Sequence, residues 1–391
     1  MKRTRIIALI LLGWTGLYAQ APISLDVAIT AALKNHPQLL AAQKELEEQS
    51  ALNKGSFSLP DPQLMLAAPT GEFFTPGIQQ GIDNPFVYIQ QAKVGKQQVT
   101  LAETGLLLSR SAVIRQVSDA YNELQYAEAG IGQSRTQDSI FNALHLATEK
   151  RFSAGDAGLL EKTSSEAKAK EAAVKLAQAE AELKNAQLAV MLLTGLDTDT
   201  NMVTVAFEKM ALIGGSTEIP VSGPFFDFAS QNADLARQQW KLAKSKIAPG
   251  YSFGYMNQGE QGSSMPHRFQ FGMTVPLWFW THNSRIKAAK ANAEKTSFES
   301  ASALQHFSVA WIDAMSSYQK NLASLDYYES TGIQQSEIIL DAATRSHTAG
   351  EVSYLEYMYS ISQALDIKSN YYEALKDYNT SVIELNYLKG N

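Results

Sequence analysis

The chain is 391 residues long, with 33 basic and 39 acidic side chains and no cysteine. This acidic balance excludes the strongly basic surface that nucleic-acid binding requires. Without cysteine, the chain has no disulfide, no thiolate metal site and no N-terminal cysteine to carry a lipid anchor. No run of charge, serine or proline reads as a linker between domains.

The N-terminus has the composition of a secretory signal peptide. Three basic residues within the first five precede an apolar run over 6–16, and Leu-Tyr-Ala at 17–19 offers a small-residue cleavage site. We interpret residues 1–19 as a signal peptide that is removed on export. Its loss takes away three basic residues and leaves a net charge of −9.

Three helices are predicted in the first structural repeat, residues 20–200. A short helix spans Ser24 to Lys54, and an alanine-rich helix, which allows close packing, spans Leu159 to Thr194. Between them, about 96–153 carries a proline-free seam of apolar residues spaced four and three apart, which is typical of a coiled coil. This helix would be about 80 to 90 Å long at 1.5 Å per residue. The seam residues are Val113, Val117, Ala120, Leu124, Ala127 and Ile131.

Two strands are predicted between the first short helix and the long helix. They are Gln63 to Ala68 and Pro85 to Gln90, and the segment rich in glycine and proline from Pro69 to Asn84 is expected to join them. Residues 201–221 are expected to connect the first repeat to the second.

The second repeat, residues 222–391, has the same order of elements. Short helices at Phe225 to Ile247 and Tyr354 to Lys389 flank a long helix over about 284–346. Strands lie within about 251–275, joined by a loop at 258–267, and aromatic residues alternate in them with small or polar ones, as in a transmembrane β-strand. The sequence predicts a membrane girdle of Tyr251, Phe253, Tyr255, Phe269, Phe271, Trp278 and Trp280.

Strands are the candidates for crossing a membrane, because no mature segment approaches the ~18 to 20 apolar residues of a spanning helix. An open four-stranded sheet would leave unpaired backbone groups in lipid, so copies of the chain must close a barrel. Two copies give eight strands with a filled interior, whereas three give twelve and a lumen. A pore therefore predicts at least a trimer. The alternative is a soluble helical bundle with edge hairpins.

A pattern of five residues occurs twice, 195 positions apart. Gly155, Leu160, Glu161, Leu193 and Gly195 recur as Gly350, Leu355, Glu356, Leu388 and Gly390. A duplicated turn followed by a long helix indicates two pseudo-symmetric halves. At the turns, glycine permits a positive φ between antiparallel helices.

This ordered set resembles the TolC-type outer-membrane efflux proteins, the outer membrane factors. The resemblance covers nearly all of the mature chain and looks closest to the branch that serves heavy-metal pumps of the RND class. The matched stretches are Ser24 to Ile29, Asn35 to Pro37, Val275 to Trp278 and Ala349 to Glu356.

The resemblance implies a mainly α fold with a transmembrane β part. It implies a homotrimer whose 12-stranded β-barrel lies in outer-membrane lipid and is continuous with an α-helical periplasmic tunnel. The tunnel end would dock a periplasmic adaptor (membrane fusion) protein coupled to an inner-membrane pump.

The resemblance also points to residues at the helical tips. It implies that Glu356 faces the pore near the periplasmic entrance, where three copies would form an acidic ring that attracts cations. Glu161 shares the same offset from its turn; for both residues the alternative is a solvated glutamate favoured by the helix dipole. Arg151 and Arg345 are candidates for holding the tunnel closed. Adaptor contacts are expected at Gly155, Asp156, His347, Gly350 and Glu351.

No catalytic, cofactor or metal site is predicted. The six histidines are scattered, and neither a phosphate loop nor a nucleophile elbow occurs. Thioethers select Cu(I), but packing or lipid contact is the favoured interpretation of Met256, Met265 and Met273. The sequence predicts a passive duct for small molecules or metal ions. A type I secretion duct of the same architecture is an alternative, and a soluble periplasmic coiled-coil adaptor is a distant one.

Overall fold

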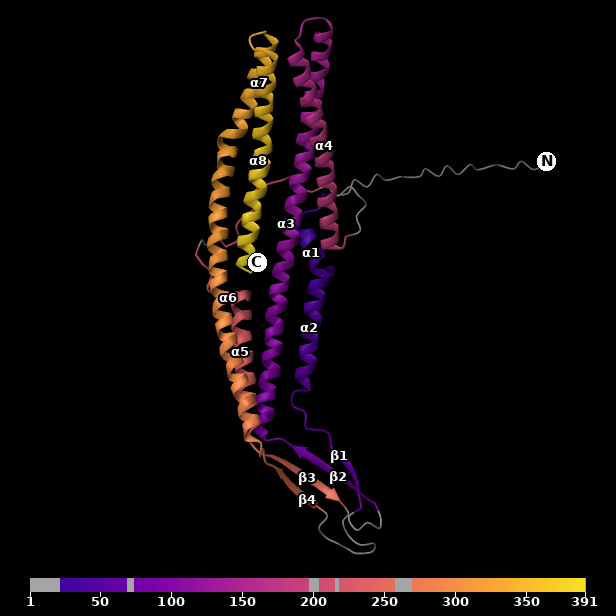
Figure 1. Ribbon diagram of the computed structural model, residues 1–391, viewed down its shortest axis with the longest axis vertical. Helices are drawn as coiled ribbons and strands as arrows, with labels where there is room; N and C mark the ends of the chain where they lie inside the picture. The colour runs from indigo at the N-terminus through magenta and orange to yellow at the C-terminus, as the bar shows by residue number, and fades with distance from the viewer. Residues whose placement is uncertain (1–21, 69–73, 197–203, 215–217, 257–268, 391) are drawn as a thin grey trace, which may run out of the picture.

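The computed structural model describes residues 22–68, 74–196, 204–214, 218–256 and 269–390. The predicted signal peptide, Met265 and the loop at 258–267 lie outside these ranges. The helices form a long rod with a small sheet at one end and the turns of two helical hairpins at the other (Figure 1).

The first predicted helix is two helices, α1 (Leu25–Asn35) and α2 (Pro37–Lys54). Ser24 caps α1, because its hydroxyl accepts from the amide of Val27. The prediction of one unbroken helix is wrong at His36, which is extended. A residue before proline is disfavoured in the helical region, and Pro37 then starts α2 where its missing N–H is not needed.

The sheet has four antiparallel strands in the order β1-β2-β3-β4. They are β1 (Gln63–Ala67), β2 (Thr75–Ile82), β3 (Gly250–Met256) and β4 (Phe269–Thr274). The strand predicted at Pro85 to Gln90 is wrong, because Pro85 is the first residue of a helix whose N-cap, Asn84, accepts from the amide of Phe86. The second strand instead lies within the segment that was predicted as a loop.

Long helices make up most of the rod. In the first repeat, α3 (Pro85–Ser153) begins well before residue 96, and its 69 residues extend for about 100 Å; α4 (Leu159–Thr194) returns beside it. In the second repeat, the single helix predicted over 284–346 is divided. Its parts are α6 (Phe279–Tyr327), a π-helical turn (Tyr328–Gly332) and α7 (Ile333–Thr348). The two short helices of this repeat are α5 (Pro224–Ser245) and α8 (Tyr354–Leu388).

The short helices meet end to end. Asn35 at the end of α1 donates its Nδ2 to the carbonyl of Thr194 at the end of α4, at 3.1 Å. In the second repeat, Gly390 beyond α8 lies against Pro224 at the start of α5. The lower helix of each pair therefore continues the line of the upper one beside a long helix (Figure 1).

Apolar seams hold the helices together. Val113, Val117 and Leu124 of α3 are fully buried against α1 and α4. The buried alanines of α4 include Ala172, Ala179 and Ala186, spaced seven apart, as expected for a helix that packs closely along its neighbour. Trp311 and Leu325 of α6 are buried against α8.

Part of the connector, residues 204–213, ties the two repeats together, and we call it the connector strap. Gln125 of α3 donates to the carbonyls of Val205 and Ala206, both at 3.1 Å. Asn379 of α8 accepts from the amide of Met210 and donates to a strap carbonyl. Side chains thus satisfy strap backbone groups that a sheet would otherwise pair.

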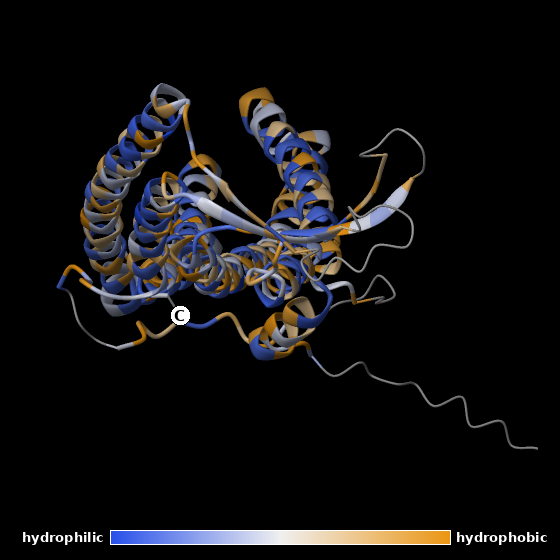
Figure 2. Ribbon diagram, turned by 90° about the horizontal axis from the view of Figure 1, so that it is seen from below, coloured by the Kyte–Doolittle hydropathy of each residue, from blue (hydrophilic) through white to orange (hydrophobic). Residues whose placement is uncertain are grey.

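Seen along the long axis from the sheet end, the helices form an open arc that mixes polar and apolar residues, and the strands cross its open side (Figure 2). The helices are packed side by side along buried seams but do not surround a common central core. An arc of this kind is the shape expected of one segment of a larger wall.

Candidate functional site

One face of the sheet is apolar and exposed. The register aligns Leu64 with Ile78, Ile78 with Tyr255, and Tyr255 with Phe269, so these four residues form one row on this face. Leu64 is 84% exposed. The exposed apolar residues of this face are Leu64, Leu66, Ile78, Tyr251, Phe253, Tyr255, Phe269, Phe271 and Met273. Exposed apolar surface this extensive marks contact with lipid or with another protein.

The aromatic residues predicted as a girdle fall into two groups. Tyr251, Phe253, Tyr255, Phe269 and Phe271 lie on the apolar face of β3 and β4, where Phe253 and Phe271 meet edge to face at a centroid distance of 5.3 Å. Trp278 and Trp280 lie at the start of α6, with ring centroids 5.2 Å apart, and both are exposed. The second group therefore marks the junction of sheet and helices.

The two edges of the sheet are open. Among the described strands, β1 pairs only with β2 and β4 only with β3. Each outer edge presents a row of backbone donors and acceptors that must be paired if the sheet lies in lipid. An edge of this kind is a template for a strand of another chain.

The two hairpin turns at the opposite end share one backbone design. Gly155 and Gly350 have φ values of +83° and +75°. The amide of Asp156 donates to the carbonyl of Arg151, and the amide of Glu351 donates to that of Ser346, each closing a Schellman motif. The duplicated glycines are therefore explained by the turn geometry.

Glu356 caps its own helix. Its Oε2 accepts from the amide of Ser353 at 2.7 Å, and its own amide donates to the Ser353 hydroxyl at 3.3 Å. The hydrogen bond from the Ser353 backbone holds the pKa of the Glu356 carboxyl below its usual range. Glu356 is an exposed residue, so its carboxylate is accessible to solvent at the tip.

Glu161 has a different environment. At the equivalent N-cap of α4 stands Gly158, which has no side chain to accept a bond, and Glu161 instead lies 3.8 Å from the guanidinium of Arg151 across the turn. Arg151 also donates to the carbonyl of Asp156 at 3.1 Å. The structure thus brings Arg151, Asp156 and Glu161 together at the first tip.

Tyr354 links the two tips and escaped the sequence analysis. It is the first residue of α8 and only 4% exposed, and burial raises the pKa of its phenol, whose hydroxyl faces Thr148 and Ser165 of the first repeat. Thr148 and Ser165 are themselves buried. A contact across some 200 positions leaves no sequence spacing that could have predicted it.

Of the remaining tip residues, His347 packs against an aromatic ring, whereas Arg345 and Glu351 form polar contacts at the surface. His347 stacks on Tyr357 with ring centroids 4.3 Å apart and nearly parallel planes. Arg345 is highly exposed and pairs with Asp341 of its own helix. Glu351 accepts from the hydroxyl of Ser346 at 3.1 Å. Arg345 thus pairs within its own helix, whereas Arg151 lies beside Tyr354.

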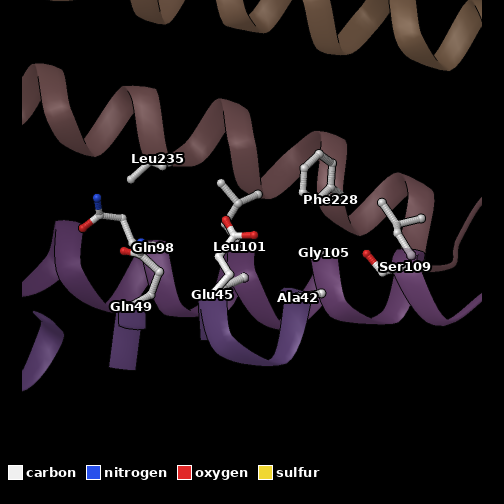
Figure 3. Close-up of a pocket in the computed structure, with 11 residues that line it drawn as sticks. Ala42, Glu45, Gln49, Gln98, Leu101, Gly105, Ser109, Phe228 and Leu235 are labelled. Atoms are coloured by element: carbon white, nitrogen blue, oxygen red, sulfur yellow. The ribbon is translucent and has the colours of Figure 1, made fainter. Parts of the chain in front are cut away.

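A groove of about 430 Å³ lies over α3, between α2 and α5 (Figure 3). Leu101, Phe228 and Leu235 supply apolar walls, and Glu45 is its one carboxylate. One carboxylate with amides and aliphatic groups offers no acid–base pair for catalysis.

Metal ligands do not gather in the part of the chain that the structure describes, since no group of three or more His, Cys, Asp or Glu side chains could hold an ion. Met256 and Met273 lie on opposite faces of the sheet. Within the same ranges, none of the helices combines the length and the apolarity that crossing a membrane requires.

Known proteins resemble this chain in two ways. Residues 226–391 match the family described as outer membrane efflux protein. No curated protein matches the chain in sequence. Similar solved structures include the outer membrane channel CmeC of Campylobacter jejuni, at 16% identity and a TM-score of 0.79 over 94% of this chain and 85% of that one.

Two further structures have the same architecture. The outer membrane protein VceC of Vibrio cholerae is 16% identical, with a TM-score of 0.76 over 94% of this chain and 96% of that one. The open outer membrane channel MtrE of Neisseria gonorrhoeae is 14% identical, with a TM-score of 0.74 over 94% and 89%. At this identity the likeness concerns the fold.

The fold of this chain is therefore that of the solved outer membrane channels. The match over residues 226–391 and the shared fold confirm the resemblance to the outer membrane efflux proteins drawn from the sequence, a family of passive channels rather than enzymes.

Proposed function

We propose that the chain is one subunit of a homotrimeric duct. Three sheets close a 12-stranded barrel in the outer membrane, and the helices form a tunnel through the periplasm. A periplasmic adaptor docks at the helical tips and couples the duct to an inner-membrane pump of the RND class, with small molecules or metal ions as cargo. The chain performs no chemistry on them.

One observation carries the proposal: an exposed apolar sheet face with two open edges is continuous with helices about 100 Å long. Lipid can cover the apolar face, but within lipid the backbone groups of each open edge can form hydrogen bonds only with another strand. Three copies give the smallest closed barrel with a lumen. The aromatic residues at the start of α6 then mark the periplasmic side of the bilayer.

The first experiment is the oligomeric mass of the mature protein, extracted from outer membranes in mild detergent, together with single-channel conductance in a planar bilayer. A trimer that conducts is the expected result. A water-soluble monomer without conductance would return the chain to the class of helical bundles.

Closure of the tunnel is assigned to the contacts of the two tips within each protomer. Tyr354 fills the space beside Thr148 and Ser165, and the Arg151–Glu161 pair lies next to it. Removing the ring in Tyr354→Ala is expected to release α8 from α3 and widen the entrance. The conductance rises in that case, and Tyr359→Ala, at an exposed residue of the same helix, is the matched control.

Glu356 is assigned to a ring at the pore entrance, and a conservative substitution separates this role from capping. Gln at this position keeps the capping box but removes the charge. Glu356→Gln is expected to lower the ratio of cation to anion permeability while leaving stability nearly unchanged. An unchanged permeability ratio would leave capping as its role.

The adaptor surface is assigned to the turns, where Asp156 and Glu351 stand beside the two glycines and His347 lies one turn away. Reversing the charge at Asp156 or Glu351 is expected to weaken crosslinking to the adaptor without affecting trimer formation. A matched reversal at Asp341, within α7, should leave crosslinking unchanged.

A type I secretion duct has the same architecture and is the second candidate. Strains lacking this chain, or the neighbouring pump genes, should be challenged with copper, silver, zinc, cobalt, detergents and dyes. Heightened sensitivity identifies an efflux duct and its substrate, with metals favoured by the matched stretches. Equal sensitivity with and without the chain would reject efflux.

A further inference from the structure

The sheet face opposite the apolar one is uncharged. None of the described strands contains Asp, Glu, Lys, Arg or His on either face. Side chains alternate along a strand, so the residues between those of the apolar face belong to this second face. In a barrel with its apolar face in lipid, the second face lines the lumen.

Three glutamines align across this second face. The register pairs Gln63 with Gln79, Gln79 with Gly254, and Gly254 with Gln270, which places all four residues in one row. We call Gln63, Gln79 and Gln270 the carboxamide row. A Cβ built on Gly254 would lie 3.7 Å from Oε1 of Gln270, so the Gln270 side chain extends over the glycine.

The two neighbouring rows on this face carry side chains that are either shorter or apolar. On the side towards the helices, Gly81 pairs with Ser252 and Ser252 with Gly272. On the side away from the helices, Met65 pairs with Gly77 and Gly77 with Met256. The longest polar side chains of this face are therefore gathered at one level.

We propose that the carboxamide row is the level at which the barrel contacts its cargo, and that it passes solutes of either charge. This inference rests on the proposed function, because the row becomes a ring of nine glutamines only when three sheets close. Each carboxamide offers both donors and an acceptor. The ring can therefore replace water around a cationic, anionic or neutral solute without the barrier that a ring of one charge imposes.

Two consequences distinguish this ring from a generic polar lining. Discrimination by charge must arise outside the described strands, because they supply no fixed charge. In addition, one new charge at this level should dominate the field in the barrel, because no opposite charge on the strands screens it.

The test adds charge of either sign to the row in the full-length protein, reconstituted in planar bilayers with a KCl gradient at low ionic strength, where fixed charges act over the longest range. Gln79→Glu and Gln270→Glu are expected to raise the ratio of K⁺ to Cl⁻ permeability several-fold. Gln270→Lys is expected to shift the ratio in the opposite direction. Gln270→Ala should increase conductance without changing the ratio.

The control is Gln80→Met, a neutral substitution of similar length one position along β2 and on the apolar face. In the wild type, Gln80 donates to the carbonyls of Pro60 and Gly81, away from the lumen, so its replacement should leave the permeability ratio at the wild-type value. Assembly of every variant is checked by its trimer mass in detergent. Conducting trimers whose ratio is insensitive to both Glu and Lys would overturn the inference. A wild-type chain without conductance would overturn the proposed duct and this inference with it.

Discussion

At the residue scale, the two copies of the repeated pattern have diverged where their contacts differ. Glu161 and Glu356 occupy the same offset from their turns. In the second repeat, the Ser353 hydroxyl accepts a hydrogen bond from the amide of Glu356 in a capping box. In the first repeat, Gly158 has no side chain that could accept such a bond, and Glu161 pairs with Arg151 instead. One sequence position has thus become a cap in one repeat and half of an ion pair in the other.

The capping box makes the start of α8 sensitive to acid. The pKa of Glu356 is lowered in the folded chain, so its contribution to stability is present above the unfolded value of 4.5 and is lost as the pH falls through the folded pKa. Amide hydrogen exchange in the first turn of α8 should accelerate in acid. Glu356→Ala should show fast exchange at neutral pH already, whereas Glu356→Gln should not. Equal protection of wild type and Glu356→Ala at pH 7 would refute the box.

Positive φ makes the turn glycines costly to replace. A Cβ at Gly155 or Gly350 meets no atom within 4 Å, so the only penalty of alanine is the left-handed backbone, roughly 1 to 2 kcal/mol. We expect Gly155→Ala and Gly350→Ala to lower the unfolding midpoint followed by circular dichroism. Gly130→Ala, within α3 and equally open, should raise the midpoint, because alanine in a helix interior stabilises the fold by about 0.5 to 1 kcal/mol relative to glycine. Shifts of the same sign at all three positions would contradict this account.

Asp119 of α3 should destabilise the chain at neutral pH. Burial raises its pKa from 3.8 to about 6, against the attraction of Arg115, whose Nε lies 3.7 Å away and 2.9 Å from Glu384. The folded chain binds this proton more tightly than the unfolded chain, so stability falls as the pH rises from about 4 to about 6.

Asp119→Asn removes that dependence. The difference in melting temperature between Asp119→Asn and wild type should be near zero at low pH, grow in favour of the variant up to about pH 6 and then level off. Asp313→Asn, which removes the same charge from an exposed position of α6, is the control. A difference that is constant with pH would show that burial does not govern this carboxyl.

At the element scale, the sequence predicted helices well wherever a seam repeated for several turns. The observed bounds of α4 are those predicted, because helix-favouring residues, rich in alanine and with neither glycine nor proline among them, run from Leu159 to Thr194. β2 escaped prediction because Pro76, Gly77 and Gly81 imitate a loop. It is a strand because it pairs with β3, about 170 positions away in the chain. Local strand propensity contains no information about a partner that distant.

The candidate site was less predictable than the elements. Alternation alone placed the aromatic residues of β3 and β4 on one face. The contacts of Tyr354 with the first tip, and of Gln125 and Asn379 with the connector strap, join segments far apart in the chain. A single sequence has no period that relates such residues, so only the packed chain reveals them.

At the scale of the whole molecule, the two repeats supply complementary halves of an incomplete object. Each contributes a hairpin to one sheet and a helical pair to one arc, and β2 pairs with β3 across the repeat boundary. The sheet nevertheless ends in two open edges. The internal repeat therefore does not close the sheet by itself; in the proposed duct, symmetry between copies closes it.

Neighbouring residues on β1 test which face meets lipid. Leu64 belongs to the exposed apolar face and Gln63 to the carboxamide row. Arginine on the lipid face costs about 2 to 4 kcal/mol near the middle of the bilayer, whereas a lumen position tolerates charge. Leu64→Arg should abolish heat-resistant trimers in outer-membrane extracts. Gln63→Arg should assemble normally and raise the relative permeability to Cl⁻. The reverse pattern, with Gln63→Arg failing to assemble, would mean that the sheet faces the other way, while equal tolerance of both would remove the sheet from the bilayer.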